Sequence, residues 1–266
     1  MDVCAFLFLI PLACRMRTRY NLLGRTYPRA ERKWLMMKVT LTIDDIASKN
    51  TPAIVDYLQE NGIQAVMFAV GTNVERYYDE AVYAVKKGII VGNHSYSHPS
   101  FSRITVREGV EEFEKNEALL DRLYRDAGAE RKFRPVRFPY GDKGGENKAA
   151  YQEYFTEKGF TKLDDSGVTY PWWKVNNLDK DIDTHWTYDF EEYRVRPGSG
   201  YTFDDVLKKM SDPAPRWGGP LFDETSRHIL LLHAHDETEE LVPEYYRILL
   251  DRLLERGAEF SLAWRK

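Results

Sequence analysis

Short apolar runs alternate with longer stretches of helical periodicity from residue 37 to the end of the chain. Most of the runs are rich in Val, Ile and Leu, which is typical of strands buried in a parallel sheet. In the longer stretches apolar residues recur every three or four positions, as on one face of an amphipathic helix. The predicted strands are 39–43, 65–70, 89–91, 134–138, 160–163, 229–232 and 259–262, and the predicted helices are 51–60, 74–87, 105–127, 148–158 and 239–256.

The repeated order of strand and helix predicts an α/β fold with a parallel sheet. Thr51 and Pro52 are expected to cap and begin the first helix, and glycines follow the predicted ends of several others. About seven or eight strand–helix units are enough to close a barrel and too many for a small open sheet. We therefore predict one catalytic domain over residues 37–266.

An insertion at about 164–227 interrupts this order. It is polar, has one helical stretch at 203–210, and is rich in aromatic residues, among them Trp172, Trp173, Trp186, Tyr188, Tyr193, Tyr201 and Trp217.

Residues 1–36 form a separate N-terminal extension in this interpretation. The apolar stretch 3–13 has the length of a signal-peptide core and is too short to span a bilayer. Asp2 precedes it where a signal has a basic residue, and dense arginine follows. Three hypotheses stay open: an export signal, a short membrane anchor, and a mis-assigned start with Met37 as the true one. The pattern favours the last, which predicts a cytoplasmic protein, whereas the first two predict export or anchoring.

Charge and cysteine content narrow the function classes. The chain carries a net charge of −4, and residues 1–37 hold seven basic and two acidic residues, so the rest carries −9. An acidic domain is a poor partner for nucleic acid, because binding to phosphates depends on clustered Lys and Arg. Both cysteines, Cys4 and Cys14, precede Met37. Disulfides, thiolate catalysis and cysteine-bound zinc are therefore excluded for the domain.

Acidic and histidine side chains follow two of the predicted strands. Asp44 and Asp45 come directly after the first strand, and as neighbours on a strand they are expected to point to opposite sides. His94 and His98 follow the third strand, four residues apart, so that on a helical turn they would share one side and a divalent ion. The alternatives are a solvated turn for the carboxylates and hydrogen-bonded structural roles for the histidines.

Two further strand ends carry polar groups. Arg137 precedes the turn formed by Pro139, Tyr140 and Gly141, so its guanidinium can pair with a carboxylate while turn N–H groups face a developing oxyanion. His233 follows the strand 229–232, where it could act as a general acid near neutral pH. In parallel barrels these strand ends meet at one face.

The joint order of these motifs over residues 37–266 resembles the polysaccharide deacetylase family, also called carbohydrate esterase family four. The matching segments are Thr42-Ile43-Asp44-Asp45, His94-Ser95-Tyr96-Ser97-His98 and Arg137-Phe138-Pro139-Tyr140, with Leu231 and His233 as the last motif. The resemblance implies a distorted (β/α) barrel with fewer than eight full units.

The resemblance also implies roles for the residues around a metal. Asp45, His94 and His98 would hold the divalent ion, usually zinc, and Asp44 would be the general base that Arg137 orients. A three-ligand ion leaves positions for water and an acyl oxygen. The same ligands also suit cobalt, nickel or manganese.

The resemblance also implies roles for residues that do not bind the metal. The Tyr140 N–H would help to stabilise the oxyanion, and His233 would protonate the leaving amine, although His235 stands two residues on and is the alternative acid. Leu231 would line the acetyl pocket, and Pro139 would contact the substrate.

Two features depart from the family pattern. Ile46 stands where the family has Gly, which we expect to alter the loop beside the metal and the fit of the substrate. The fourth motif, an Asp that tunes the acid and a Trp in the groove, has no clean match. Either 175–179 occupies it, with Asn in place of Asp, or 183–186 does, and we favour Trp186 as the groove residue.

The sequence thus predicts a metal-dependent hydrolase that removes acetyl groups from an N-acetylated or O-acetylated carbohydrate. Aromatic residues of the insertion would stack on sugar faces or, alternatively, pack as a hydrophobic cover over the barrel mouth. Two other functions stay open: an amidase or deformylase acting on a small molecule, and a carbohydrate-binding pseudoenzyme. The pseudoenzyme predicts a missing base, acid or ligand, and none is missing.

Overall fold

A computed structural model describes residues 37–265 of the chain. The extension 1–36 and the three hypotheses about it lie outside the described residues. In the described part no helix is both long and apolar enough to cross a membrane.

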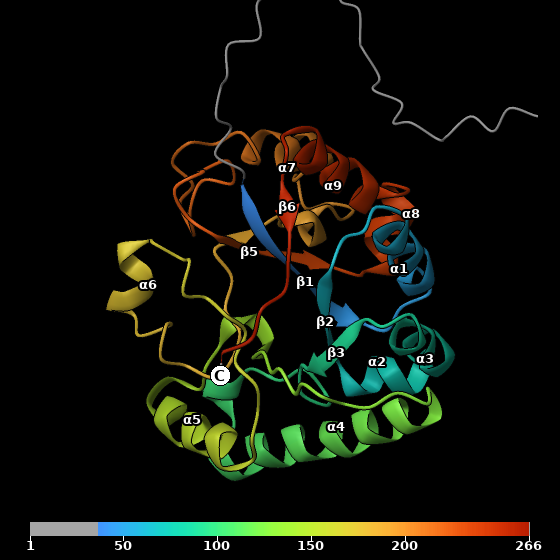
Figure 1. Cartoon of the computed structure of the whole chain (residues 1–266), viewed down its shortest axis with the longest axis vertical. Helices are drawn as coiled ribbons and strands as arrows, with labels where there is room; N and C mark the ends of the chain where they lie inside the picture. The colour runs from blue at the N-terminus through green and yellow to red at the C-terminus, as the bar shows by residue number, and fades with distance from the viewer. Residues whose placement is uncertain (1–36, 266) are drawn as a thin grey trace, which may run out of the picture. The chain divides into compact units, whose positions relative to one another are not determined.

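A parallel sheet forms the centre of the domain (Figure 1). Its strand order is β3-β2-β1-β5-β4, and β6 pairs with the start of β1. All these pairs are parallel, and in the β1–β5 ladder Thr42 stands opposite Leu231 and Asp44 opposite His233. The bounds are β1 Lys38–Ile46, β2 Ala65–Ala69, β3 Ile90–Asn93, β4 Tyr188–Asp189, β5 His228–His233 and β6 Glu259–Phe260.

Irregular segments complete the ring of strands. The predicted strand 134–138 contributes one bridge, between Val136 and Asn93, and the carbonyl of Val136 accepts a hydrogen bond of 2.8 Å from Thr184 N–H. Because Thr184 lies just before β4, this contact links the β3 side of the sheet to the β4 side. The predicted strand 160–163 likewise forms a single bridge, from Leu163 to Trp264. The result is the distorted barrel that the sequence predicts.

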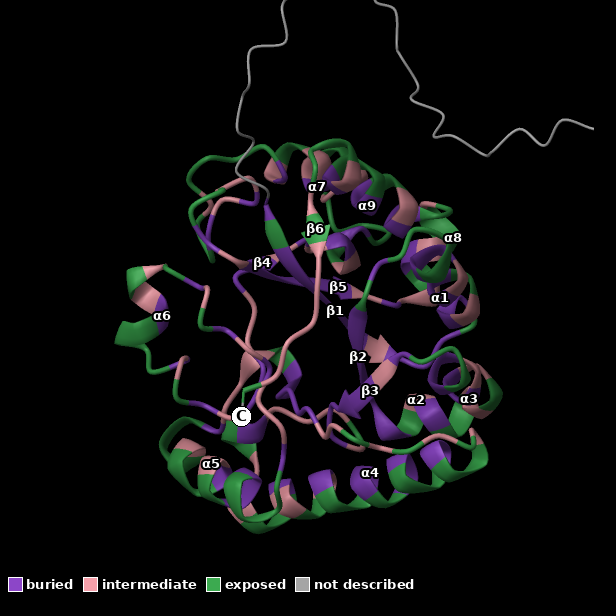
Figure 2. Cartoon of the chain, in the orientation of Figure 1, coloured by how far each residue is buried: buried purple, intermediate pink, exposed green. Residues whose placement is uncertain are grey.

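Helices surround the strands in Figure 1, and their apolar faces turn inward (Figure 2). The longest, α4, starts at a capping box in which Thr105 and Glu108 satisfy each other's backbone N–H groups, and it buries Phe113, Leu120 and Leu123. The bounds are α1 Thr51–Glu60, α2 Gly71–Arg76, α3 Tyr78–Lys86, α4 Val106–Asp126, α5 Lys148–Glu157, α6 Pro171–Val175, α7 Phe203–Lys209, α8 Asp236–Leu241 and α9 Tyr245–Glu255, with 3₁₀ turns at Phe101–Arg103, Pro139–Gly141, Gly145–Asn147 and Glu192–Arg194.

Three local predictions differ from the structure. The predicted helix 74–87 is two helices that meet at Tyr77, whose ψ of 54° is not helical. The predicted helix 239–256 breaks between α8 and α9, because Pro243 disfavours helical backbone at the residue before it. The first helix begins at Thr51 itself, so Asn50 is the capping position, and no side-chain cap hydrogen bond forms there.

Candidate active site

Asp44 and Asp45 lie at the carboxyl end of β1. The register of the β1–β2 ladder shifts between Ile43 and Ile46, and Asp45 has a φ of 65°. This left-handed conformation breaks the alternation expected of a strand. As a result both carboxylates line one cavity of about 390 Å³ instead of pointing to opposite sides.

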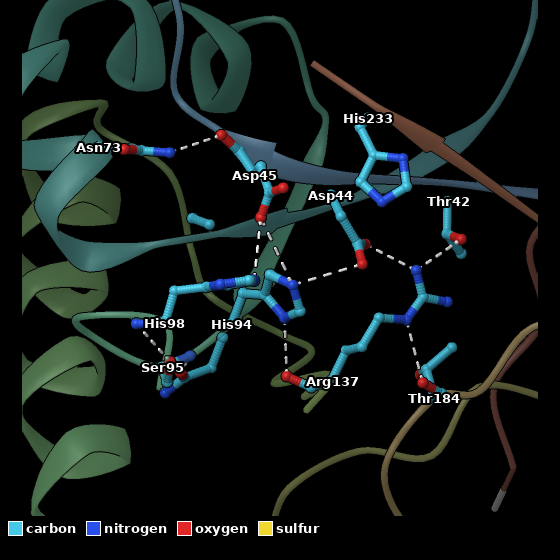
Figure 3. Close-up of polar contacts among 12 residues, drawn as sticks. Thr42, Asp44, Asp45, Asn73, His94, Ser95, His98, Arg137, Thr184 and His233 are labelled. Atoms are coloured by element: carbon cyan, nitrogen blue, oxygen red, sulfur yellow. Dashed lines mark hydrogen bonds and ion pairs between the residues drawn. The ribbon is translucent and has the colours of Figure 1, made fainter. Parts of the chain in front are cut away.

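His94 and His98 follow β3 on an irregular turn and not on the helical turn considered from their spacing, because Ser95 and His98 both have positive φ. The Nδ1 atom of His94 lies 2.9 Å from the carbonyl oxygen of Arg137. Since a carbonyl only accepts, Nδ1 carries the proton and Nε2 keeps its lone pair. That Nε2 lies 3.6 Å from Oδ1 of Asp45, and Nε2 of His98 lies 3.3 Å from the same oxygen (Figure 3).

The donor set of Asp45, His94 and His98 fits a divalent metal. One ligand atom from each lies within 4.8 Å of the others. The Oδ1 atom of Asp45, on which both imidazoles converge, is buried and accepts no hydrogen bond from the described residues. Leaving a buried carboxylate oxygen without a donor is costly unless a cation is bound there. This orphaned oxygen is the observation that favours a metal.

Protonation states agree with metal binding. Burial lowers the pKa of His98 to about 4, and His94 adds to the effect, so the imidazole is neutral near pH 7. Burial alone would raise the pKa of Asp45, but the hydrogen bond from His235 and the neighbouring histidines hold it well below its usual range. A carboxylate and neutral imidazoles are the forms that coordinate metals.

Arg137 holds Asp44 in place through a direct contact with its carboxylate (Figure 3). Its side chain is fully buried, and Nη1 lies 2.6 Å from Oδ1 of Asp44 and 2.9 Å from Oγ1 of Thr42. Its Nε donates to the carbonyl of Thr184. The second carboxylate oxygen of Asp44 lies 3.4 Å from Nε2 of His94, so Asp44 stands beside the metal ligands without belonging to the group of three.

His233 stands at the end of β5, and its partner is Glu192. The Glu192 carboxylate is fully buried, and Oε1 lies 2.6 Å from the His233 backbone N and 3.0 Å from its Nδ1. Burial alone would lower the pKa of His233, but Glu192, with smaller effects from Asp189 and Asp45, raises it to about 10. The imidazole is therefore protonated at neutral pH, and Nε2 is left for a ligand.

This pairing corrects the expectation for the fourth motif. Neither of the predicted segments supplies the acid's partner: Asp183 hydrogen-bonds to Gln152 and pairs with Lys143, and no residue of 175–179 lines the cavity. Glu192 takes the place implied for the Asp, and Tyr193 lines the cavity and packs edge-on against His233 at 4.7 Å. Trp186, the predicted groove residue, lines the cavity as well. The missed signal was an acidic residue followed by an aromatic one.

The 390 Å³ cavity brings nearly all predicted site residues together. Pro139 and Arg137 are the exceptions: both are buried and neither lines this cavity, although Arg137 contacts Asp44, which does. The lining residues are Asp44, Asp45, His94, His98, Tyr140, Trp186, Asp189, Tyr193, Arg196, Leu231, His233 and His235.

Tyr140 lines the site cavity, whereas Ile46 lies in the core. Tyr140 has a φ of 59° in a tight turn, its ring lies 4.5 Å from that of His98, and no hydrogen bond joins its N–H to a described residue. That N–H is thus free to meet an oxyanion. Ile46 is fully buried in the hydrophobic core and does not line the cavity, so its bulk does not narrow the site.

A larger cavity of about 860 Å³ adjoins the first and shares Trp186, Asp189 and Tyr193 with it. Trp172 and Trp217 also line it, and Trp217 is 72% exposed. The insertion therefore divides its aromatic residues, because Trp173 and Tyr188 are core residues whereas these lie along the cavity.

Comparison with known proteins gives consistent matches. Residues 36–159 match the model of the polysaccharide deacetylase family. A peptidoglycan-N-acetylglucosamine deacetylase of Bacillus cereus is 35% identical over 106 residues, which are 40% of this chain and 37% of that relative. A peptidoglycan-N-acetylmuramic acid deacetylase of Bacillus subtilis is 32% identical over 39% of this chain and 21% of its own length. The chain thus matches little more than a third of the first relative and about a fifth of the second.

Among solved structures, a chitin deacetylase from the fungus Colletotrichum lindemuthianum superposes with a TM-score of 0.57. The superposition covers 84% of each chain at 20% identity. This likeness confirms the predicted distorted barrel.

Proposed function

We propose that this chain, whose residues 36–159 match the polysaccharide deacetylase model, is a member of that family and a metal-dependent hydrolase that removes acetyl groups from N-acetylated carbohydrate. The observation that carries the proposal is the convergence on one cavity of three metal-ligating side chains, a carboxylate held by Arg137 and a protonated histidine held by Glu192. These are the groups that hydrolysis of an amide requires: an activated water, a base and an acid.

Asp45, His94 and His98 would hold the metal. A divalent ion there would polarise the acyl oxygen and lower the pKa of a bound water to about 7. Zn²⁺ suits an Asp-His-His set with open positions, and Co²⁺, Ni²⁺ and Mn²⁺ suit it as well.

Asp44 is suited to the role of base. Arg137 fixes one carboxylate oxygen at 2.6 Å, which leaves the second oxygen, beside His94, to accept a proton from water.

His233 is suited to the role of acid on the neighbouring strand. Its pKa of about 10 keeps the imidazole charged at neutral pH, and the bond to Glu192 orients Nε2 toward the cavity where the leaving amine would form. The free N–H of Tyr140 would donate to the oxyanion from the opposite turn.

The two adjoining cavities favour an oligosaccharide over a small molecule. The site cavity of about 390 Å³ would take the acetylated sugar, with Leu231 against the methyl group, and the 860 Å³ cavity would take further sugars. Trp172, Trp186 and Trp217 line this second cavity and offer flat apolar surfaces for sugar rings.

Acetate release tests the proposal. The purified protein is incubated with chitin oligosaccharides, acetylated xylan or peptidoglycan fragments, first with a chelator and then with zinc or cobalt restored. We expect metal-restored release from at least one substrate and none from Asp44→Asn, which keeps the size of the side chain. A metallated protein that releases no acetate from any of them would contradict the proposal and favour the small-molecule amidase or the pseudoenzyme.

A further inference from the structure

We infer that His235 is a positioning residue for the metal site: it hydrogen-bonds one oxygen of Asp45 so that the other oxygen alone faces the metal. The inference rests on the metal site of the proposed function, but not on the identity of the substrate. His235 comes from the loop after β5, two residues beyond the acid His233.

The two oxygens of Asp45 have different partners. Nε2 of His235 lies 2.7 Å from Oδ2, whereas Oδ1 lies 3.3 Å from Nε2 of His98 and 3.6 Å from Nε2 of His94. Because Oδ1 accepts no hydrogen bond from the described residues, it is the oxygen available to a cation. Asp45 is thereby arranged to bind through a single oxygen.

The proton of His235 can be assigned from its other neighbour. Nη2 of Arg196 lies 3.5 Å from Nδ1 of His235, and a guanidinium only donates. Nδ1 is therefore the acceptor and Nε2–H the donor to Asp45. Arg196 is itself held, since it donates to the carbonyl of Tyr193 at 2.7 Å and pairs with Glu237.

Different residues fix the backbone and the carboxylate of Asp45. Its carbonyl accepts from Nδ2 of Asn73 at 2.8 Å, which fixes the main chain in the left-handed conformation. No described residue other than His235 hydrogen-bonds the carboxylate, so His235 is what fixes its rotation. Removing a residue that hydrogen-bonds a metal ligand typically lowers metal affinity about 10–100-fold.

His235 is neither a fourth ligand nor the acid in this geometry. Its ring nitrogens do not join the group of three in which all ligand atoms lie within 4.8 Å of one another. His233 and not His235 is paired with the buried Glu192.

His235 also closes the site on one side. With Asp45 and Arg196 it lines both the site cavity and a third cavity of about 420 Å³.

The test compares His235→Ala, His235→Gln and His94→Ala with the wild type. Zinc affinity is measured by competition with a chromophoric chelator, and ligand geometry by the visible spectrum of the Co²⁺ form. Thermal unfolding of the metal-free proteins reports whether each variant folds.

We expect a 10–100-fold loss of affinity and an altered Co²⁺ spectrum in His235→Ala, with recovery in His235→Gln, which keeps an N–H donor. Affinity of His235→Ala within twofold of the wild type would overturn the inference. So would a loss as complete as in His94→Ala that Gln does not restore, because His235 would then be a ligand. A wild type that binds zinc but releases no acetate would contradict the proposed function and leave this inference standing.

Discussion

Replacing Glu192 by Gln should move the pH range over which the enzyme works. Gln keeps the size of the side chain and an oxygen that accepts from the His233 backbone N–H, but it removes the charge next to the imidazole. Burial lowers the pKa of His233, and in the variant the Glu192 charge that opposes this effect is gone. The pKa of His233 should therefore fall.

The size of the shift follows from the distance. Two unit charges about 3 Å apart interact by roughly 5 kcal/mol at an effective dielectric constant of about 20, which corresponds to about four pKa units. The pKa of His233 would fall from about 10 to roughly 6. At pH 8 only about 1% of the variant would hold the proton that the leaving amine needs, so kcat/KM should fall about 100-fold. At pH 5.5 most of it would be protonated, and the difference should narrow to a few-fold.

The assay is the pH profile of kcat/KM for acetate release. Glu114→Gln, which removes an exposed carboxylate paired with Lys158 on the outer surface, controls for the loss of one charge. An alkaline limb that stays near pH 10 in Glu192→Gln would refute the reasoning. The raised pKa also stabilises the fold below pH about 6.5, and that stabilisation is lost as the pH rises through about 10. The wild type should therefore exceed the variant in unfolding free energy at pH 6 but not at pH 10.

Three further predictions concern the metal ligand His94 and the Asp44–Arg137 pair. Asp44→Asn should lower the rate by more than about 100-fold while the zinc content stays at the wild-type level; an active variant would exclude Asp44 as base. His94→Ala should lose zinc and activity together, as measured by metal analysis and acetate release, and a metallated, active variant would refute the triad. Arg137→Ala should lower the unfolding free energy in urea by about 3–5 kcal/mol, because it leaves the Asp44 carboxylate buried without its partner; a loss below about 1 kcal/mol would contradict this.

The strand-end residues could be predicted because the fold is parallel. Asp44, His94 and His233 each follow an apolar run, Arg137 stands just before a turn, and the carboxyl ends of parallel strands meet at one face. The order of strands and helices along the chain is therefore enough to predict that these residues lie close together. Their roles remain predictions until the variants are measured.

Glu192 could not be found by the same reasoning. It lies in the insertion, where no periodic pattern fixes its position, and 41 residues separate it from His233. The contact of His235 with Asp45 could not be predicted either, because the direction of the carboxylate depends on the left-handed backbone at Asp45. The break before α9 could have been predicted, because Pro243 disfavours a continuous helix there. The helical spacing of apolar residues on both sides of Pro243 led to the prediction of one helix.

The pairing of Asp44 with His233 in the β1–β5 ladder has a consequence for how specificity can change. Adjacent parallel strands lie about 4.8 Å apart, and backbone hydrogen bonds maintain that separation. The backbone spacing between Asp44 and His233 is thus a property of the sheet and not of the surrounding loops. Stretches of the insertion 164–227 that lie away from β4 and Glu192 can be lengthened, shortened or exchanged, and these two strand-end residues keep their spacing.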